Sequence, residues 1–260
     1  MTEARGAKTS FSQRIKARET LIGTFIKVPT THTTEVIGSV GYDFIVIDQE
    51  HAPFDRLSID GVILASLANG MPALVRVGDP SAANILSALD AGASGVLVPH
   101  VDSAEKAAGA ASACRYRSGH RGFSRTGRAG GYGSAGVADH IARQDAETLC
   151  IAMIEDVVAI ERIDAIAGTE GVDAIFIGRA DLSVAMGEVT PSAPRVVEAV
   201  KAIAAGVARS GKPLLMLAES VADRQAMLEL GASSFLVGSD LAFLRRAATQ
   251  ALAEHTKPVA

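Results

Sequence analysis

The stretch CIAMIEDVVAIERIDAIAGTEGVDAIFIGRADLS, residues 150–183, decides the fold of this chain. It opens with a short apolar run, continues through a segment of helical character, and returns after Gly171 to a second apolar run. Short runs rich in Val, Ile, Leu and Phe predict strands that are covered on both faces, which is typical of parallel sheets. The stretch therefore predicts a strand, a covering helix and a second, parallel strand.

The same pattern recurs along the whole chain. Alanine-rich amphipathic stretches at 103–114, 192–208 and 222–230 predict helices between the apolar runs. The eight strand–helix units of this 260-residue chain predict an α/β fold, a (β/α)8 (TIM) barrel that forms one domain over residues 1–260. Residues 1–10 should form a frayed start. An open doubly wound sheet is the main alternative, but no GxGxxG follows the first run. The eight apolar runs cover residues 21–27, 43–48, 73–77, 95–99, 150–156, 173–178, 213–217 and 234–238.

Composition argues against several classes of function. A formal charge of −4 offers no basic field for nucleic acid, so we expect no nucleic-acid partner. No run of about 18 apolar residues and no apolar N-terminal segment occurs, so we expect no membrane partner and no export signal. Cys114 and Cys150 are the only cysteines, too few for a disulfide framework. We therefore expect a cytoplasmic protein that acts on small molecules.

Polar side chains follow several of the predicted strands. Barrel enzymes work at the carboxyl ends of their strands, because these ends meet at one mouth. Each residue alone could be a solvated loop charge, but their joint placement at four strand ends weakens that interpretation. The residues are Asp48, Gln49, Glu50 and His51 after the second run, Arg76 on the third, Glu155 and Asp156 after the fifth, and Gly178, Arg179, Ala180 and Asp181 after the sixth.

Two of these carboxylates could share a metal ion. Glu155 and Asp181 should lie on neighbouring strand tips, without histidine or cysteine beside them, which suits Mg²⁺ or Mn²⁺, with Co²⁺ as a substitute in vitro. Asp181 has an alternative role as the N-cap of a helix over DLSVAMGE, residues 181–188. Backbone N–H groups at the start of that helix could bind the carboxylate of a small keto acid, and the two roles are compatible.

His51 and Arg76 are candidates for proton transfer and charge stabilisation. His51 lies three residues after Asp48, so a turn could bring this carboxylate to the imidazole and orient it. The competing interpretation is an ordinary loop histidine. A guanidinium on a barrel strand needs an anionic partner, so Arg76 should face a carboxylate, a keto oxygen or a developing enolate.

The positions of the lysines give little support to a Schiff-base mechanism. A Schiff base needs a lysine that projects into the barrel, and only Lys27 of the seven lysines falls at the end of a predicted strand. We expect Lys27 to be a charge near the substrate and not a Schiff-base lysine, and we expect neither PLP nor NAD. A long irregular segment, residues 115–136, follows the fourth predicted strand and could cover the mouth of the barrel.

Several motifs carry a resemblance to a known family. From about residue 21 onward the chain resembles the metal-dependent class II pyruvate aldolases of the HpcH/HpaI aldolase/citrate lyase family, typified by 4-hydroxy-2-oxoheptane-1,7-dioate aldolase. The resemblance implies a carbon–carbon lyase that joins pyruvate, or another 2-oxo acid, to an aldehyde or cleaves the product, in the catabolism of aromatic compounds. The motifs are DFIVIDQEHAPFD (43–55), ALDAGASGVLVPHV (88–101), RYRSGHRG (115–122), MIEDVVAIERIDAIAGTEGVDAIFIGRADLS (153–183) and GASSFLVGSDLAFL (231–244).

The resemblance also implies roles for individual residues. It matches the metal ligands to Glu155 and Asp181, and it places a further catalytic aspartate, which could reach a neighbouring subunit, at Asp90. It implies a homo-oligomer, a trimer or a trimer-based hexamer, in which the last helix exchanges between neighbours. The catalytic histidine, its paired aspartate and the enolate-stabilising arginine fall at His51, Asp48 and Arg76. The substrate-binding positions fall at Phe25, Arg76, Met153, Gly178, Arg179, Ala180, Asp181 and Leu217.

Three positions depart from the pattern of that family. Phe25 stands where tryptophan is common, Met153 where glutamine is common and Arg179 where proline is common. None removes a metal ligand, but together they leave the acceptor aldehyde undefined. Five cations could favour an acidic acceptor, unless they are rim charges or subunit contacts: Lys27, Arg179, Arg121, Arg125 and Arg128.

Three alternatives keep the same site. The same enolate could arise by decarboxylation of oxaloacetate, which needs no additional residue. A lyase acting on a coenzyme-A thioester, such as a malyl or citramalyl ester, is less favoured because no additional nucleotide-binding element is evident. A metabolite-binding paralogue without catalytic activity is the alternative from another class.

Overall fold

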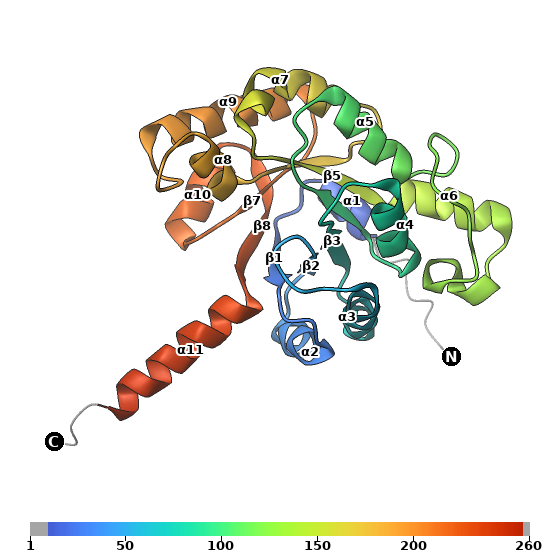
Figure 1. Cartoon of the computed structure of the whole chain (residues 1–260), viewed down its shortest axis with the longest axis horizontal. Helices are drawn as coiled ribbons and strands as arrows, with labels where there is room; N and C mark the ends of the chain where they lie inside the picture. The colour runs from blue at the N-terminus through green and yellow to red at the C-terminus, as the bar shows by residue number, and fades with distance from the viewer. Residues whose placement is uncertain (1–9, 257–260) are drawn as a thin grey trace, which may run out of the picture.

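Parallel strands form the centre of the molecule. The computed structural model describes residues 10–256, and within them the sheet closes into a barrel in the order β1 to β8 (Figure 1). The predicted (β/α)8 barrel is confirmed, and every predicted strand overlaps a strand of the structure. The strands are β1 (Leu21–Ile26), β2 (Phe44–Asp48), β3 (Ala73–Arg76), β4 (Gly95–Val98), β5 (Leu149–Ile154), β6 (Ala174–Ile177), β7 (Leu214–Leu217) and β8 (Ala232–Ser239).

Helices surround the barrel (Figure 1). The three helices predicted from alanine-rich stretches correspond to α5 (Ala104–Ala113), α9 (Pro194–Ser210) and α10 (Val221–Glu229). Among residues 10–256, no helix is long and apolar enough to cross a membrane. The other helices that follow barrel strands are α2 (Thr31–Val40), α3 (Arg56–Ala68), α4 (Ala82–Asp90), α7 (Val157–Gly168) and α8 (Arg179–Ala185).

The side chains of each strand alternate between two apolar layers. In β2, Phe44 and Val46 belong to the cluster inside the barrel, whereas Ile45 and Ile47 belong to the cluster between the sheet and the helices. The interior accommodates the ring of Phe44 because residue 23 is glycine, where a Cβ would lie only 2.6 Å from that ring. The alternation directs every second residue at a strand end toward the mouth of the barrel.

A short helix at the start of the described chain was not predicted. Helix α1 (Phe11–Lys16) begins after Ser10, whose hydroxyl caps its first turn. Phe11 packs against Phe44, with ring centroids 5.3 Å apart. Ser10 is therefore part of the fold, which corrects the expected frayed start at this residue, and residues 1–9 lie outside the described part.

Ion pairs hold the segment 115–136 against the side of the barrel. The suggestion from the sequence that this segment could cover the mouth is therefore not met. It contains the 3-10 helix η1 (Arg128–Gly133), and α6 (Val137–Glu147) follows it. Its arginines reach acidic residues on α3, α4 and the start of β6. The ion pairs are Arg128 to Asp60 at 2.7 Å, Arg121 to Asp90 at 3.0 Å and Arg115 to Asp173 at 2.6 Å.

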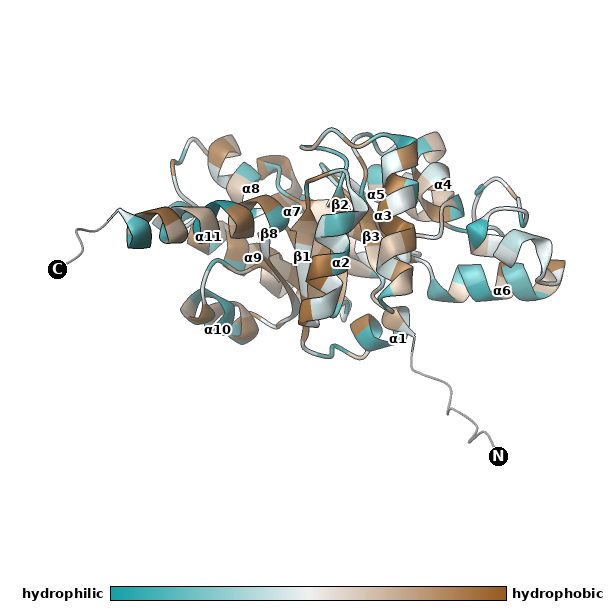
Figure 2. Cartoon of the chain, turned by 90° about the horizontal axis from the view of Figure 1, so that it is seen from below, coloured by the Kyte–Doolittle hydropathy of each residue, from teal (hydrophilic) through white to brown (hydrophobic). Residues whose placement is uncertain are grey.

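The last helix, α11 (Asp240–His255), extends away from the barrel (Figure 1). Apolar and hydrophilic residues share its surface in Figure 2. Leu244 and Leu252 lie exposed on it. Such leucines fit the expected exchange of this helix between neighbours, which stays a prediction.

Candidate active site

Strand alternation brings two carboxylates to the mouth of the barrel. Asp48 continues the inward-facing series of Phe44 and Val46, and Glu155 continues that of Ile151 and Met153. Asp48 is 0% exposed and Glu155 is 2% exposed. Buried carboxylates need donors or cations around them, so their partners define the site.

Asp48 is the anionic partner that Arg76 was expected to need. The two residues are paired in the register of β2 and β3, and Arg76 donates from Nε and Nη2 to the two carboxylate oxygens at 2.9 and 2.8 Å. Lys27 Nζ lies 3.0 Å from Oδ2 of Asp48. Burial acts to raise the pKa of Asp48, but the hydrogen bonds and charge of Arg76, together with the hydrogen bond of Lys27, outweigh it and lower this pKa. Asp48 is therefore an anion that holds two cations at the mouth.

The imidazole of His51 lies beside Glu50 and not beside Asp48. Asp48 Oδ1 accepts a hydrogen bond from the backbone N–H of His51 at 3.2 Å, whereas Nε2 of the ring lies 3.7 Å from Glu50 Oε2. The expected contact between Asp48 and the ring is therefore replaced, because the Asp48 side chain faces Arg76 inside the barrel. The same oxygen of Glu50 lies 3.3 Å from Nη1 of Arg76. Glu50 thus links the histidine to the arginine.

One carboxylate oxygen of Glu155 has no partner. Its Oε1 accepts from the backbone N–H of His100 at 2.9 Å, but its buried Oε2 has no hydrogen bond within the described residues. Gly178 leaves room for this atom, since a Cβ there would lie 2.7 Å from Oε2. Burial raises the pKa of Glu155 to about 7; the charges of Asp181 and Glu50 add to the shift and His100 opposes it.

These surroundings fit a divalent cation. A buried carboxylate oxygen without a donor is stabilised by a proton or by a metal ion. Asp181 lies near enough for its charge to act on Glu155. Helix α8 begins at Arg179 after the N-cap Gly178, so Asp181 is in its first turn and is not the N-cap that the sequence suggested. Its side chain is therefore not needed to cap the helix.

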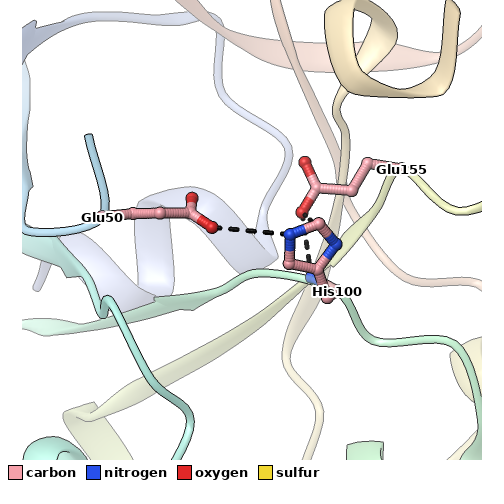
Figure 3. A group of neighbouring side chains, drawn as sticks. All are labelled: Glu50, His100 and Glu155. Carbon is pink, nitrogen blue, oxygen red and sulfur yellow. Dashed lines mark hydrogen bonds and ion pairs between the residues drawn. The ribbon is translucent and has the colours of Figure 1, made fainter. Parts of the chain in front are cut away.

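A histidine that was not among the predicted site residues completes the acidic group. Figure 3 shows Glu50 and Glu155 on either side of the ring of His100. Ligand atoms of these three residues all lie within 4.8 Å of one another. His100 comes two residues after Val98, the last residue of β4, so the rule that singled out strand ends could have found it. Burial lowers the pKa of His100, but the charges of Glu155, Asp156 and Glu50 raise it overall.

A cavity of about 350 Å³ opens at the mouth of the barrel, and Glu50, His100 and Glu155 are not among the residues that line it. Its volume suits a small keto acid and an aldehyde. His51 and Lys27 line it together with all eight positions expected to bind substrate, whose individual roles stay predictions. These eight are Phe25, Arg76, Met153, Gly178, Arg179, Ala180, Asp181 and Leu217.

Two expected features lie elsewhere. Asp90 stands at the end of α4, paired with Arg121, and it does not line the cavity of its own chain. None of the three arginines 121, 125 and 128 lines it either. Of the five cations considered for an acidic acceptor, only Lys27 and Arg179 do. Arg179 donates to both carboxylate oxygens of Asp223, at 3.0 and 2.6 Å.

The model of the HpcH/HpaI aldolase/citrate lyase family matches residues 21–247. The chain belongs to this family. The predicted family is thereby confirmed, and this HpcH/HpaI family member is a carbon–carbon lyase of the class II aldolase type.

Relatives of this HpcH/HpaI family member match it over almost their full length. It is 37% identical to the 5-keto-4-deoxy-D-glucarate aldolase of Salmonella arizonae, over 95% of this chain and 96% of the relative. Among solved structures, a HpcH/HpaI aldolase/citrate lyase family protein from Burkholderia cenocepacia superposes with a TM-score of 0.88 and 29% identity, over 95% of this chain and 98% of that chain. The HpcH/HpaI aldolase from Desulfitobacterium hafniense superposes with a TM-score of 0.91 and 25% identity, over 96% and 98%.

Proposed function

We propose that this family member catalyses the reversible aldol addition of pyruvate, or a related 2-oxo acid, to an aldehyde, with a divalent ion held by Glu155 and Asp181. The observation that carries the proposal is the unpartnered, buried Oε2 of Glu155 beside a cavity that Asp181, His51 and Arg76 line. A place for a cation, a candidate base and a fixed guanidinium thus surround one space of substrate size.

A bound divalent ion would supply a Lewis acid that polarises the keto group of pyruvate and so acidifies its methyl group. Mg²⁺ or Mn²⁺ suits two carboxylate ligands, and Co²⁺ is a substitute in vitro. Backbone N–H groups of Ala180 and Asp181, which line the cavity at the start of α8, would bind the pyruvate carboxylate.

His51 is the proposed base. Its side chain is 50% exposed, so the ring can turn toward a substrate in the cavity. Glu50, 3.7 Å from Nε2, would stabilise the imidazolium that forms when His51 takes a methyl proton. The methyl carbon then forms the new bond to the aldehyde carbon, and the aldehyde oxygen gains a proton. Cleavage follows the same path in reverse.

Arg76 would stabilise the negative charge that develops on the keto oxygen. Its guanidinium is held by two hydrogen bonds to Asp48 and lies 4.9 Å from the ring centroid of Phe25. A donor that is fixed before the reaction needs no reorganisation during it, which is the main source of electrostatic stabilisation in enzymes.

Sodium borohydride tests the competing imine route. The ammonium group of Lys27 forms an ion pair with Asp48, which supports a role as a charge and not as a nucleophile. We expect no reduced pyruvyl adduct on Lys27 after treatment with pyruvate and borohydride. Mass spectrometry that finds the adduct would replace the metal-dependent mechanism by an imine mechanism.

The acceptor is proposed to carry a carboxylate. Lys27 and Arg179 both line the cavity, and the side chain of Lys27 is 29% exposed. The Salmonella relative is named for a glucarate derivative, which also points to an acid. A role in the catabolism of aromatic compounds stays a prediction.

We also propose a cytoplasmic homo-oligomer, a trimer or a hexamer, in which Asp90 serves the site of a neighbouring subunit and α11 exchanges between neighbours. The position of Asp90 outside its own cavity and the exposed leucines of α11 support this. Cys114 and Cys150 are free and buried, in keeping with a reducing compartment. Light scattering after size-exclusion chromatography measures the mass, and a monomer at micromolar concentration would contradict the proposal.

A screen of pyruvate with a panel of aldehydes, with and without Mg²⁺, Mn²⁺ and Co²⁺, tests the activity. We expect metal-dependent formation of a 4-hydroxy-2-oxo acid. Parallel reactions contain oxaloacetate alone, or malyl- and citramalyl-coenzyme A. Turnover of either in the absence of any aldol product would favour the corresponding alternative, and no turnover at all would favour a metabolite-binding paralogue.

A further inference from the structure

His100 has an unusual backbone that directs it at the acidic group. Its φ of 52° lies in the left-handed region, which is uncommon for a residue other than glycine and often marks a functional site. In this conformation the backbone N–H donates to Oε1 of Glu155 at 2.9 Å. The ring lies between Glu50 and Glu155 (Figure 3). Both the main chain and the side chain of His100 therefore face the carboxylates at the mouth.

The two ring nitrogens of His100 have different surroundings. Nδ1 lies 3.2 Å from Oδ2 of Asp156, within hydrogen-bond distance, and 3.5 Å from Oε1 of Glu155. Nε2 lies 3.6 Å from Oε1 of Glu50, too far for a hydrogen bond. An imidazole that binds a metal through one nitrogen usually donates from the other to a carboxylate, which sets the tautomer and orients the ring. Asp156 and His100 have this arrangement, with Nε2 left toward Glu50.

An unpartnered carboxylate oxygen marks where a cation would lie. Oε2 of Glu155 is buried and has no hydrogen bond within the described residues, whereas Oε2 of Glu50 faces Nη1 of Arg76 at 3.3 Å. Ligands about 2.0–2.2 Å from one ion lie about 3–4 Å from each other. Ligand atoms of Glu50, His100 and Glu155 all lie within 4.8 Å of one another, close to that spacing.

We propose that Nε2 of His100, oriented by Asp156, is a nitrogen ligand of the divalent ion that Glu155 holds. The inference rests on the metal site of the proposed function and adds a ligand that distinguishes between ions. Carboxylates alone suit Mg²⁺, whereas imidazole favours transition metals, whose affinities rise from Mn²⁺ to Co²⁺. The centre therefore selects Mn²⁺ or Co²⁺ over Mg²⁺.

Pulsed electron paramagnetic resonance of the substrate-free protein loaded with Mn²⁺ tests this ligand directly. We expect ¹⁴N modulation from a bound nitrogen in the wild type, replaced by a ¹⁵N pattern when histidine alone is labelled. His100→Asn should abolish the modulation; asparagine tolerates the left-handed backbone, so the N–H contact to Glu155 is retained. His51→Asn is the matched control and should keep it. No nitrogen signal in the wild type, its persistence in His100→Asn, or its loss in His51→Asn would overturn the proposal.

Calorimetric titration with Co²⁺ and Mg²⁺ gives a second measurement. In His100→Asn the ratio of Co²⁺ affinity to Mg²⁺ affinity should fall about 10- to 100-fold, and Asp156→Asn should lower Co²⁺ affinity in the same direction. An unchanged ratio in His100→Asn would contradict the proposal. Neither measurement uses pyruvate or an aldehyde. The nitrogen ligand can therefore be ruled out without ruling out aldol turnover, and aldol turnover without ruling out the nitrogen ligand.

Discussion

Arg76 and Asp48 stand on neighbouring strands, paired in register, and meet in two hydrogen bonds of 2.9 and 2.8 Å at the mouth of the barrel. Both side chains are buried. The pair fixes the guanidinium at the edge of the substrate cavity. Removal of the Asp48 carboxylate should therefore affect stability as well as catalysis.

Asp48→Asn should lower the free energy of unfolding by about 3 kcal/mol, because it leaves Arg76 buried without its full counter-charge. The control is Asp164→Asn, which breaks an exposed ion pair with Arg209 and should cost less than about 1 kcal/mol. Urea unfolding monitored by circular dichroism measures both. Equal small effects of the two substitutions would mean that the buried pair does not fix the arginine.

The stability of the metal-free protein should depend on the ionisation of Glu155. Its pKa is about 7 in the folded chain and 4.5 ordinarily, so between these values the folded state holds a proton that the unfolded state has released. The free energy of unfolding should therefore fall as pH rises from 4.5 to 7, by at most about 3 kcal/mol. Glu155→Gln should remove this fall and stabilise the metal-free protein at pH 8. Parallel stability curves for the variant and the wild type would show that Glu155 does not titrate in this range.

His51→Ala should slow the exchange of pyruvate methyl protons with deuterated solvent about 10² to 10⁴-fold, the usual effect of removing a general base. Affinity for Mn²⁺ should change little, because His51 is not among the proposed ligands. Proton nuclear magnetic resonance follows the exchange, and calorimetry follows the metal. Exchange at the wild-type rate would assign the proton transfer to another group.

An aldehyde with a carboxylate should be preferred over a neutral aldehyde of equal length by about ten- to a hundred-fold in kcat/KM, if Lys27 and Arg179 pair with it. Succinic semialdehyde and a neutral analogue make the comparison at low and high salt. Arg179→Pro should reduce the preference, and proline is tolerated there because residue 179 is the first residue of α8. A preference that neither salt nor Arg179→Pro changes would argue against these cations as the acceptor site.

The fold could be predicted because strand and helix patterns are local. Runs such as residues 43–48 predicted their strands to within one residue. Helix α1 was missed because it has only six residues, and it is stabilised by contacts such as that of Phe11 with Phe44, which lies on a strand distant in sequence. Contacts of this kind cannot be read from a local pattern.

The sequence indicated which strand ends carry the site residues, but not which side chains contact one another there. The sequence suggested that Asp48 orients the ring of His51. In the barrel, the carboxylate of Asp48 instead binds Arg76, its partner in strand register, and the ring of His51 lies beside Glu50. The position of His100 at a strand end was predictable, since it directly follows the predicted run 95–99, but its contacts were not. Its importance depends on Glu155 of the neighbouring strand end, which only the closed barrel brings to it.

The most direct test of a metal-dependent pyruvate aldolase needs no knowledge of the acceptor. Metal-stripped protein is incubated with pyruvate in deuterated solvent, with and without Mn²⁺, and loss of the methyl proton signal is followed by nuclear magnetic resonance. We expect exchange only when Mn²⁺ is present, and none in the double variant Glu155→Ala, Asp181→Ala, whose circular dichroism should match that of the wild type. Exchange that is independent of added metal, or that survives in the folded double variant, would contradict it.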